Sequence, residues 1–413
     1  MAYNPNIKTI YQFSNEPTGF PNRTDTAISF DNESRTFTIA PTGSSFEYYI
    51  GGVKYTKLLS VDSTITDDEG IWYFYFDGPD LLSTQTFSPT FFTDYCIVAI
   101  LYWDASNNEA IYFGEERHGM TMDSATHGYL HNTVGAAFAN GFAISVTAVD
   151  GNGSSDSHAK LAVENGIFYD EDIKHVIQDG LPQVLSSAAE IPIYFRSGPT
   201  GNWRKKTADA FPVIHGGTAG YSGTRLPYNQ WTGSTWQLTQ LATNDFVLVH
   251  YFATNDVSAP IIGVQGITEY VNKPQAIAGA YSEISQLSGL PFSEMIPIGT
   301  AIFQTSNSFS NAIKAKITSA DGSAYIDFRD IQDLAINQVN DHGNLSGLTD
   351  PDHPASAIYT SFASFAGNLS AADTTVQEAL DTIDDISIAN KTLSNLSTTS
   401  INVSLLPDAD ISY

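Results

Sequence analysis

The sequence is poor in cysteine and has no long apolar segment. Cys96 is its one cysteine, which excludes a disulfide within the chain and a cysteine-based metal site. The longest apolar run extends from Cys96 to Trp103, far short of the ~20 residues that a membrane-spanning helix needs. Residues 1–8 also lack the apolar stretch of a secretory signal. We therefore expect no membrane insertion.

Positive charge is also scarce. The 18 Lys and Arg residues stand against 45 Asp and Glu, which gives a formal net charge of -27. This imbalance repels nucleic acid and anionic lipid, so nucleic acid is excluded as a partner. The sequence contains no P-loop, Rossmann fingerprint or His-Glu-x-x-His pattern. We therefore expect no cofactor.

The sequence does contain enough apolar residues for a folded body. Hydrophobic residues make up 42% of the chain, with 24 Phe and 21 Tyr among them, which excludes wholesale disorder. Period-two alternation around turn residues predicts hairpins at 46–55, 96–113 and 246–264. Residues 71–76 are apolar or aromatic on both faces, which is typical of a strand packed on two sides. Helical pieces are expected at 170–179 and 276–287.

These patterns predict a mainly β fold with two β-sandwich-like modules, followed by a turn-rich linker and a short coiled coil in an elongated chain. Shifts in composition divide the chain into six segments: an arm at 1–25, β-rich modules at 26–155 and 156–330, a histidine-containing linker at 331–370, the coiled coil at 371–397 and the start of a shaft repeat at 398–413. The arm is polar and interrupted by prolines, so we expect it to become ordered only when docked on a partner.

A heptad-like pattern occupies the coiled-coil segment. Its seam comprises Val376, Ile383 and Asn390 at a, Ala379, Ile386 and Leu393 at d, and Leu380 at e. β-branched residues at a with isoleucine at d favour three strands over two, and a single asparagine at a specifies the register. The pattern is short, so an ordinary amphipathic helix remains an alternative.

A turn motif upstream of the seam resembles one found in bacteriophage tail fibres. It comprises Asp341, His342, Gly343, Asp350, Asp352 and His353. In those fibres an acidic-His-Gly turn and an Asp-Asp-His-Pro-like turn precede the distal shaft, although the family more often has an acidic residue where this chain has Pro351. Modules of phage structural proteins are similar to residues 114–119, 127–133, 203–211, 229–233 and 297–300.

The resemblance implies a homotrimeric virion fibre protein, assembled in the host cytoplasm and without enzymatic activity. It implies attachment of the N-terminal arm to a tail, baseplate or neck protein, and contact of the distal end with a host glycan or receptor. Residues 405–413 resemble the opening of a repeat that usually continues, so we expect the native chain to extend further. The alternatives are a head or neck (collar) fibre, and a tailspike enzyme that degrades host polysaccharide.

Carboxylate pairs are the first candidates for chemistry. Glu115 and Glu116 are adjacent in an expected strand and would point to opposite faces, so we expect them not to share a site. Residues 170–172 are also acidic. Both groups are interpreted as solvated loop charge, and no catalytic residue is assigned.

Histidines are the second candidates. His127 and His131 would share one face of a helix, and His118 lies nearby in the sequence. A threefold axis would triplicate His342 and His353. A metal site is an alternative in both places, but we interpret these side chains as turn histidines bonded within the protein and predict no metal.

The last candidates are three tryptophans and one basic cluster. We expect Trp203, Trp231 and Trp236 in the core, with sugar-stacking platforms as the alternative. Residues 204–206 form the only basic cluster in the sequence, which suits docking of an acidic partner.

The heptad seam yields a prediction about assembly. We expect the full chain to form a stable homotrimer, because an isolated helix of this length is marginal in water and buries its apolar stripe only by self-association. Sedimentation equilibrium of the recombinant protein measures this directly. A stable monomer would contradict self-association, and a dimer would contradict the choice of three strands.

Overall fold

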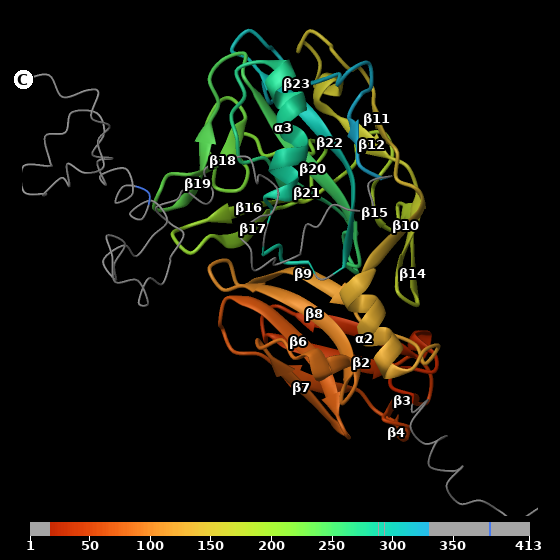
Figure 1. Cartoon of the computed structure of the whole chain (residues 1–413). Helices are drawn as coiled ribbons and strands as arrows, with labels where there is room; N and C mark the ends of the chain where they lie inside the picture. The colour runs from red at the N-terminus through yellow and green to blue at the C-terminus, as the bar shows by residue number, and fades with distance from the viewer. Residues whose placement is uncertain (1–16, 288, 293, 330–379, 381–413) are drawn as a thin grey trace, which may run out of the picture. The chain divides into compact units, whose positions relative to one another are not determined.

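The computed structural model describes residues 17–287, 289–292, 294–329 and Leu380 (Figure 1). The chain divides into two compact units, 1–337 and 338–413. The turn motif and the coiled-coil seam lie outside the described residues, except that Leu380 is helical and 51% exposed. The first unit is called the body below.

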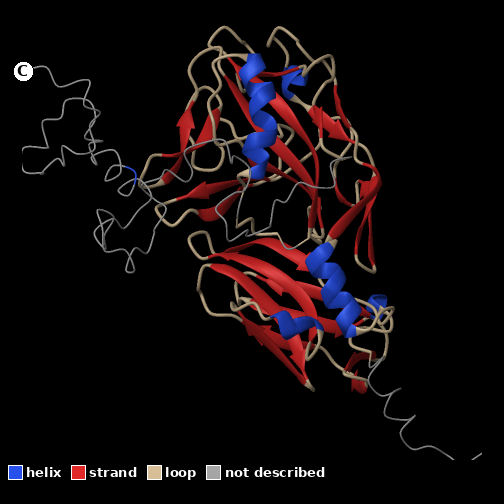
Figure 2. Cartoon of the chain, viewed as in Figure 1, coloured by secondary structure: helices blue, strands red, loops and turns tan. Residues whose placement is uncertain are grey.

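The body is mainly β, as the sequence predicts (Figure 2). Its first half contains the sheet β1 (Thr26–Asp31), β2 (Thr36–Pro41) and β5 (Val61–Thr64), the hairpin β3 (Phe46–Ile50) and β4 (Val53–Lys57), and the four-stranded sheet β7 (Asp80–Thr84), β6 (Gly70–Asp77), β8 (Cys96–Asp104) and β9 (Glu109–Glu115). The predicted hairpins at 46–55 and 96–113 are confirmed as the antiparallel pairs β3–β4 and β8–β9.

Aromatic rings join these first sheets. Phe37 stacks on Phe74 with ring centroids 4.4 Å apart, and Tyr48 stacks on Phe76 at 4.0 Å. All four side chains are fully buried. Removing a buried ring of this size typically costs about 3–5 kcal/mol, so this packing accounts for much of the stability of the first half.

The second half contains a small four-stranded sheet, a two-stranded pair and a larger mixed sheet. The small sheet is β10 (Ala136–Gly141), β13 (Gly166–Asp170), β14 (Ile173–Asp179) and β15 (Pro182–Gln183), and the pair is β11 (Ile144–Val146) and β12 (Leu161–Val163). The larger sheet runs β17 (Asn202–Lys206), β16 (Ile193–Ser197), β21 (Ile261–Gln265), β20 (Phe246–Thr254), β22 (Met295–Thr305) and β23 (Ala315–Thr318), with β24 (Ile326–Asp327) also paired to β22. A separate hairpin is formed by β18 (Pro227–Trp231) and β19 (Trp236–Gln240).

Strands β8 and β20 are buried along their whole lengths, which explains their continuous apolar sequences. In β8, Leu101 and Trp103 pack in the core of the first half, whereas Ile100 and Tyr102 face a second core. That second core also receives Phe252 from β20 and side chains from both halves of the body. The predicted hairpin at 246–264 is confirmed as the pair β20–β21.

Two α-helices occur in the described residues, α2 (Ser124–Thr133) and α3 (Lys273–Ser285), beside short 3-10 turns at Arg23–Asp25, Pro89–Phe92 and Asp156–Ala159. Helix α3 confirms the helix expected near 276–287 and packs Ala276, Ala280 and Ile284 against the large sheet. The prediction of a helix at 170–179 is wrong. Ile173 and Ile177 are buried while Lys174 and Val176 are exposed, and this period of two belongs to strand β14.

Residues 17–25, placed in the N-terminal arm by sequence, are part of the body. Phe20 is 1% exposed, and its backbone N–H donates to the carbonyl oxygen of His118 at 2.8 Å. Gly19 is required there, because a Cβ on it would stand 2.7 Å from that same oxygen.

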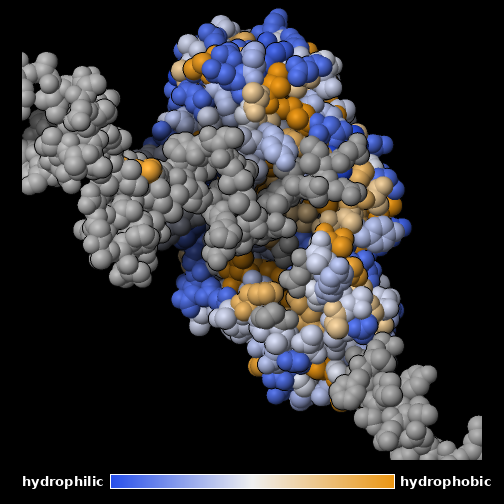
Figure 3. All heavy atoms as spheres, in the orientation of Figure 1, coloured by the Kyte–Doolittle hydropathy of each residue, from blue (hydrophilic) through white to orange (hydrophobic). Residues whose placement is uncertain are grey.

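The surface of the body agrees with the acidic, polar composition. Hydrophilic side chains predominate over the coloured part of the visible face, with several hydrophobic patches between them (Figure 3). Within the described residues, neither helix has the length and apolar character needed to cross a bilayer.

Candidate metal centre

Helix α2 presents two histidines on one face. Its N-terminus is capped by Asp123, whose carboxylate accepts from the backbone N–H groups of Ala125 and Thr126. It ends where Gly135 adopts a positive φ of 57° and donates its N–H to Leu130. Within the helix, His127 and His131 are four residues apart and therefore neighbours on its surface.

The residues after β9 supply a glutamate and a histidine. Glu115 is bound by Arg117, whose Nε donates to Glu115 Oε1 at 2.7 Å, and by Arg23 at 3.5 Å. Glu116 is fully buried on the other side of the chain and accepts from Asn255 Nδ2 at 3.0 Å. The expectation that this pair does not share a site is therefore confirmed, but its interpretation as solvated loop charge is wrong.

The tight turn between β13 and β14 supplies three consecutive carboxylates. Asp170 closes β13 opposite Ile173, and its side chain is fully buried. Glu171 has a φ of 41°, a left-handed conformation that costs a residue with a side chain roughly 1–2 kcal/mol. The side chain of Glu171 is also inaccessible to solvent. These carboxylates are not solvated loop charge either.

Asp172 orients the central histidine of the cluster. Its Oδ1 lies 2.9 Å from His118 Nδ1, and its Oδ2 accepts from the Gly119 N–H at 2.8 Å. A Cβ on Gly119 would stand 2.6 Å from that Oδ2, so a glycine is needed for the approach. This contact directs His118 Nε2 toward the other carboxylates, which is the arrangement that orients metal-bound histidines.

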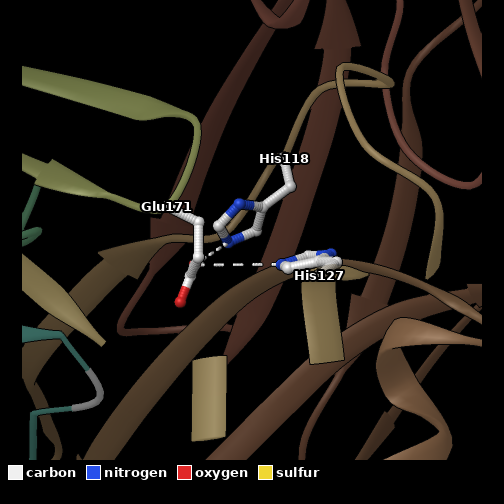
Figure 4. A group of neighbouring side chains, drawn as sticks. All are labelled: His118, His127 and Glu171. Atoms are coloured by element: carbon white, nitrogen blue, oxygen red, sulfur yellow. Dashed lines mark ion pairs between the residues drawn. The ribbon is translucent and has the colours of Figure 1, made fainter. Parts of the chain in front are cut away.

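Three carboxylates face that nitrogen at distances too long for hydrogen bonds. His118 Nε2 lies 3.7 Å from Glu116 Oε2, 3.8 Å from Asp170 Oδ2 and 3.8 Å from Glu171 Oε2. His127 Nε2 approaches the same Glu171 Oε2 to 3.9 Å. Figure 4 shows both imidazoles directed at the Glu171 carboxylate.

A second group of donors adjoins the first. His131 Nδ1 lies 3.6 Å from Glu171 Oε1 and 3.4 Å from Glu294 Oε1. Glu294 precedes β22 and is 4% exposed. His175, in β14, stacks on Phe168 and places its Nε2 4.0 Å from Asp170 Oδ2. We call Glu116, His118, His127, His131, Asp170, Glu171, His175 and Glu294 the cluster.

Many donor atoms in the cluster lack a hydrogen-bond partner among the described residues. They are His118 Nε2, His127 Nε2, His131 Nδ1, His175 Nε2 and both carboxylate oxygens of Asp170 and Glu171. Such orphaned buried groups are rare in proteins. By contrast, the buried His250 uses Nδ1 on Thr300 at 2.7 Å and Nε2 on Glu283 at 3.3 Å.

Burial and mutual repulsion disturb the acid–base behaviour of the cluster. Burial, and then the negative charges of Glu294 and Glu116, holds the pKa of Asp170 well above its usual range. Burial raises the pKa of Glu294 to about 8, and it lowers the pKa of His127 to about 3. Although burial opposes it, the hydrogen bond to Asp172 and the charge of Glu116 raise the pKa of His118 to about 10. Without a metal ion, protons on the carboxylates and on His118 therefore have to compensate the buried charge.

A cation at the centre would satisfy these groups. The donor atoms of His118, His127 and Glu171 all lie within 4.8 Å of one another, as do those of Glu116, His118 and Asp170. Donors bound to one ion at about 2.1 Å stand about 3.0–3.4 Å apart at right or tetrahedral angles, and the N···O distances of 3.7–3.9 Å between the histidines and these carboxylates exceed that spacing by less than about one ångström. Imidazole nitrogen mixed with carboxylate oxygen suits Zn²⁺, Mn²⁺, Fe²⁺ or Co²⁺.

The structure thus brings together some sequence candidates and adds others. His127 and His131 share a helix face, and the His127 ring lies 4.3 Å from that of His118, centroid to centroid. This arrangement favours the metal alternative for them over turn histidines. Sequence reasoning missed His175 and Glu294 and set aside Glu116 and Asp170. The high density of acidic residues and histidines at 115–118 and 170–175 is the sequence feature that could have indicated these ligands. His342 and His353 lie outside the described residues.

The tryptophans have different environments. Trp203 is 4% exposed and belongs to the second core, as expected. Trp231 is 46% exposed, so the prediction that it lies in the core is wrong. Its ring centroid lies 5.6 Å from that of the half-buried Trp236. Together with Tyr228 and Glu269 they border a surface depression of about 420 Å³, and a sugar-stacking platform stays the untested alternative for these two.

The basic cluster is neutralised within the body. Arg204 pairs with Glu69 at 2.6 Å, and Lys205 pairs with Glu109 at 2.8 Å. Lys206 is 1% exposed and donates to Asp209 at 2.7 Å. Docking of an acidic partner on these three residues is therefore not favoured.

Comparison with known proteins identifies no relative. The chain matches no protein-family model, no curated protein and no solved structure.

The Lys206–Asp209 pair predicts a pH dependence of stability. Burial opposes ionisation of Asp209, but hydrogen bonds from His215 and Lys206 outweigh it and lower the pKa of Asp209 to about 2. The pKa of Asp209 is lower in the folded protein than in the unfolded chain, where it is near 3.9. The ionised carboxylate therefore stabilises the folded protein at pH values above about 4, and this stabilisation is lost as the pH falls toward about 2. Asp209→Asn should lower the unfolding free energy by about 1–3 kcal/mol at pH 7.

Chemical denaturation at several pH values measures this effect. The difference between wild type and Asp209→Asn should shrink between about pH 4 and pH 2. Glu33→Gln, at an exposed turn position, is the control and should change stability little. A difference that stays constant with pH would contradict the assignment.

Proposed function

We propose that the body of this chain binds a divalent transition-metal ion between Glu116, His118, His127, Asp170 and Glu171. The observation that carries the proposal is the convergence of His118 Nε2, His127 Nε2 and the carboxylate oxygens of Asp170 and Glu171, which are buried and have no hydrogen-bond partner among the described residues. Buried charge without compensation costs several kcal/mol per ion. Coordination of a cation removes that penalty and uses the orphaned atoms.

A structural role fits this ion better than a catalytic one. Catalytic metals keep a position open to substrate, whereas structural sites are closed. His118 is 3% exposed and Asp170 is fully buried. The cavity bordering His118 and His127 has a volume of about 10 Å³, which admits no more than about one water molecule.

The gain from such an ion is a link between segments that are distant in the sequence. Its ligands come from the residues after β9, from α2 and from the β13–β14 turn. Because the unfolded chain does not hold these segments together, the binding free energy contributes to folding stability.

Metal content and its effect on stability test the proposal. We expect mass spectrometry of the native protein to show at least one bound ion per chain. Chelation should lower the unfolding free energy by about 3 kcal/mol if the ion is present at about 100 times its dissociation constant. His118→Ala should lose the ion on dialysis, whereas His215→Ala, which removes another carboxylate-bound histidine, should retain it.

A graded variant separates metal binding from simple loss of packing. Asp172→Asn keeps the size of the side chain that orients His118, and we expect metal affinity to fall about 10–100-fold. The proposed function would be refuted if the wild-type protein contained no metal and if neither chelators nor added Zn²⁺ or Mn²⁺ changed its stability.

We further propose that this metal-binding body belongs to a structural subunit of a homotrimeric virion fibre, in the part nearest the particle. The support is the resemblance of the turn motif at 341–353 to tail fibres, the heptad seam that follows it, and a mainly β body. A head or neck fibre shares these features. A tailspike enzyme is less favoured, because the described sheets lack the long parallel ladder of a β-helix.

Attachment through the N-terminal residues tests this role. Residues 17–25 pack into the body, so deletion of residues 1–16 leaves Phe20 and its contacts in place. We expect the shortened protein to remain a folded trimer with its metal but to be absent from purified particles. Removal of the exposed Leu58 and Leu59 side chains by alanine is the control. Normal incorporation of the shortened chain would place attachment elsewhere.

A further inference from the structure

We propose that the cluster holds two divalent ions bridged by Glu171. This inference rests on the proposed metal-binding function and concerns how many ions it involves. The first ion is the one described above, bound by His118, His127 and Glu171 with Glu116 and Asp170. The second lies between Glu171, His131 and Glu294.

The two oxygens of Glu171 face different histidines. Oε2 lies 3.8 Å from His118 Nε2 and 3.9 Å from His127 Nε2, whereas Oε1 lies 3.6 Å from His131 Nδ1. A carboxylate with one oxygen toward each of two donor sets is suited to bridge two ions. Such paired ions are about 3.5–4 Å apart in proteins.

His131 and Glu294 lie apart from the donor groups of the first ion. Among the described residues, the two donor sets whose atoms all lie within 4.8 Å of one another contain neither His131 nor Glu294. His131 Nδ1 lies 3.4 Å from Glu294 Oε1 and 3.6 Å from Glu171 Oε1, so a second ion beside His131 would draw these two carboxylates closer together.

The balance of charge agrees with two ions. Glu116, Asp170 and Glu294 are buried, and the side chain of Glu171 is inaccessible to solvent. Within the described residues, the ion pairs of Asp170, Glu171 and Glu294 are all to histidines. The nearby Arg23 and Arg117 both pair with Glu115. Two divalent ions would match the four carboxylate charges once the histidines bind them as neutral imidazoles.

The two sites differ in access to solvent. The His131 side chain is 20% exposed, whereas those of His118 and His127 are 3% and 8% exposed. The second ion also has fewer protein ligands, which leaves positions for water. We therefore expect it to exchange first when the protein is treated with a chelator.

Loading the full-length protein with Mn²⁺ tests the inference. We expect two Mn²⁺ per chain by mass spectrometry, and an electron paramagnetic resonance spectrum of a spin-coupled pair. Glu294→Gln has nearly the same shape as the native side chain and should bind one Mn²⁺ with an uncoupled six-line spectrum. His131→Ala should behave in the same way, and His215→Ala should retain two coupled ions.

The outcomes separate this inference from the proposed function. One tightly bound Mn²⁺ in the wild type, unchanged by Glu294→Gln, would overturn the two-ion centre and leave the single metal site standing. No bound Mn²⁺ and no bound Zn²⁺ in wild type would overturn both. Two uncoupled ions, with Glu294→Gln still binding two, would place the second ion outside the cluster and contradict the bridge.

Discussion

Burial of several carboxylates against one another is the constraint on which the centre of this molecule depends. Asp170 and Glu116 have no exposed surface, and Glu294 has little. Ionised carboxylates in such a place are strongly destabilising unless positive charge or protons compensate them. The raised pKa of Asp170 and Glu294 is the consequence in a metal-free protein. A bound cation resolves the conflict without protonation.

The surrounding fold holds these groups in place from several directions. Asn255, at the turn after β20, donates from Nδ2 to the Glu115 carbonyl oxygen at 2.9 Å and to Glu116 Oε1 at 3.0 Å. Tyr112 of β9 also bonds to Asn255. The turn of the large sheet is thereby tied to the end of the first half, beside the cluster. Phe20 closes another side through its bond to His118. Rigid sheets thus supply the precision that a metal site needs.

Arginine and lysine are few in this chain, and those near the interior form specific ion pairs. With 18 basic against 45 acidic residues, most cations that lie near the interior are committed to a specific acid. Arg117 forms an ion pair with Glu115, Arg204 with Glu69, and Lys206 with Asp209. At the cluster, histidines and, by our proposal, metal ions compensate the negative charge of the carboxylates. The apparent basic patch in the sequence is therefore an internal set of ion pairs.

Local patterns determined much of the secondary structure from the sequence alone. The hairpin at 46–55 depends on alternation and on Gly51 and Gly52, both at positive φ, and such features act within a few residues. The apolar runs of β8 and β20 likewise indicated burial on both faces. The helix expected at 170–179 failed because the residues between Ile173 and Ile177 permit either period, and pairing with β13 favoured the strand.

Only the tertiary structure decided which polar residues form the site. By sequence, Glu116 and Asp170 look like ordinary loop carboxylates, because nothing in their neighbours shows what covers them. His118 and Asp172 are 54 positions apart, and Glu294 is more distant still. Solvation of a carboxylate depends on packing of remote segments, whereas strand and turn formation depends on adjacent ones. The sequence therefore determined the β framework and the presence of nearby histidines, and the fold alone brought them to one buried point.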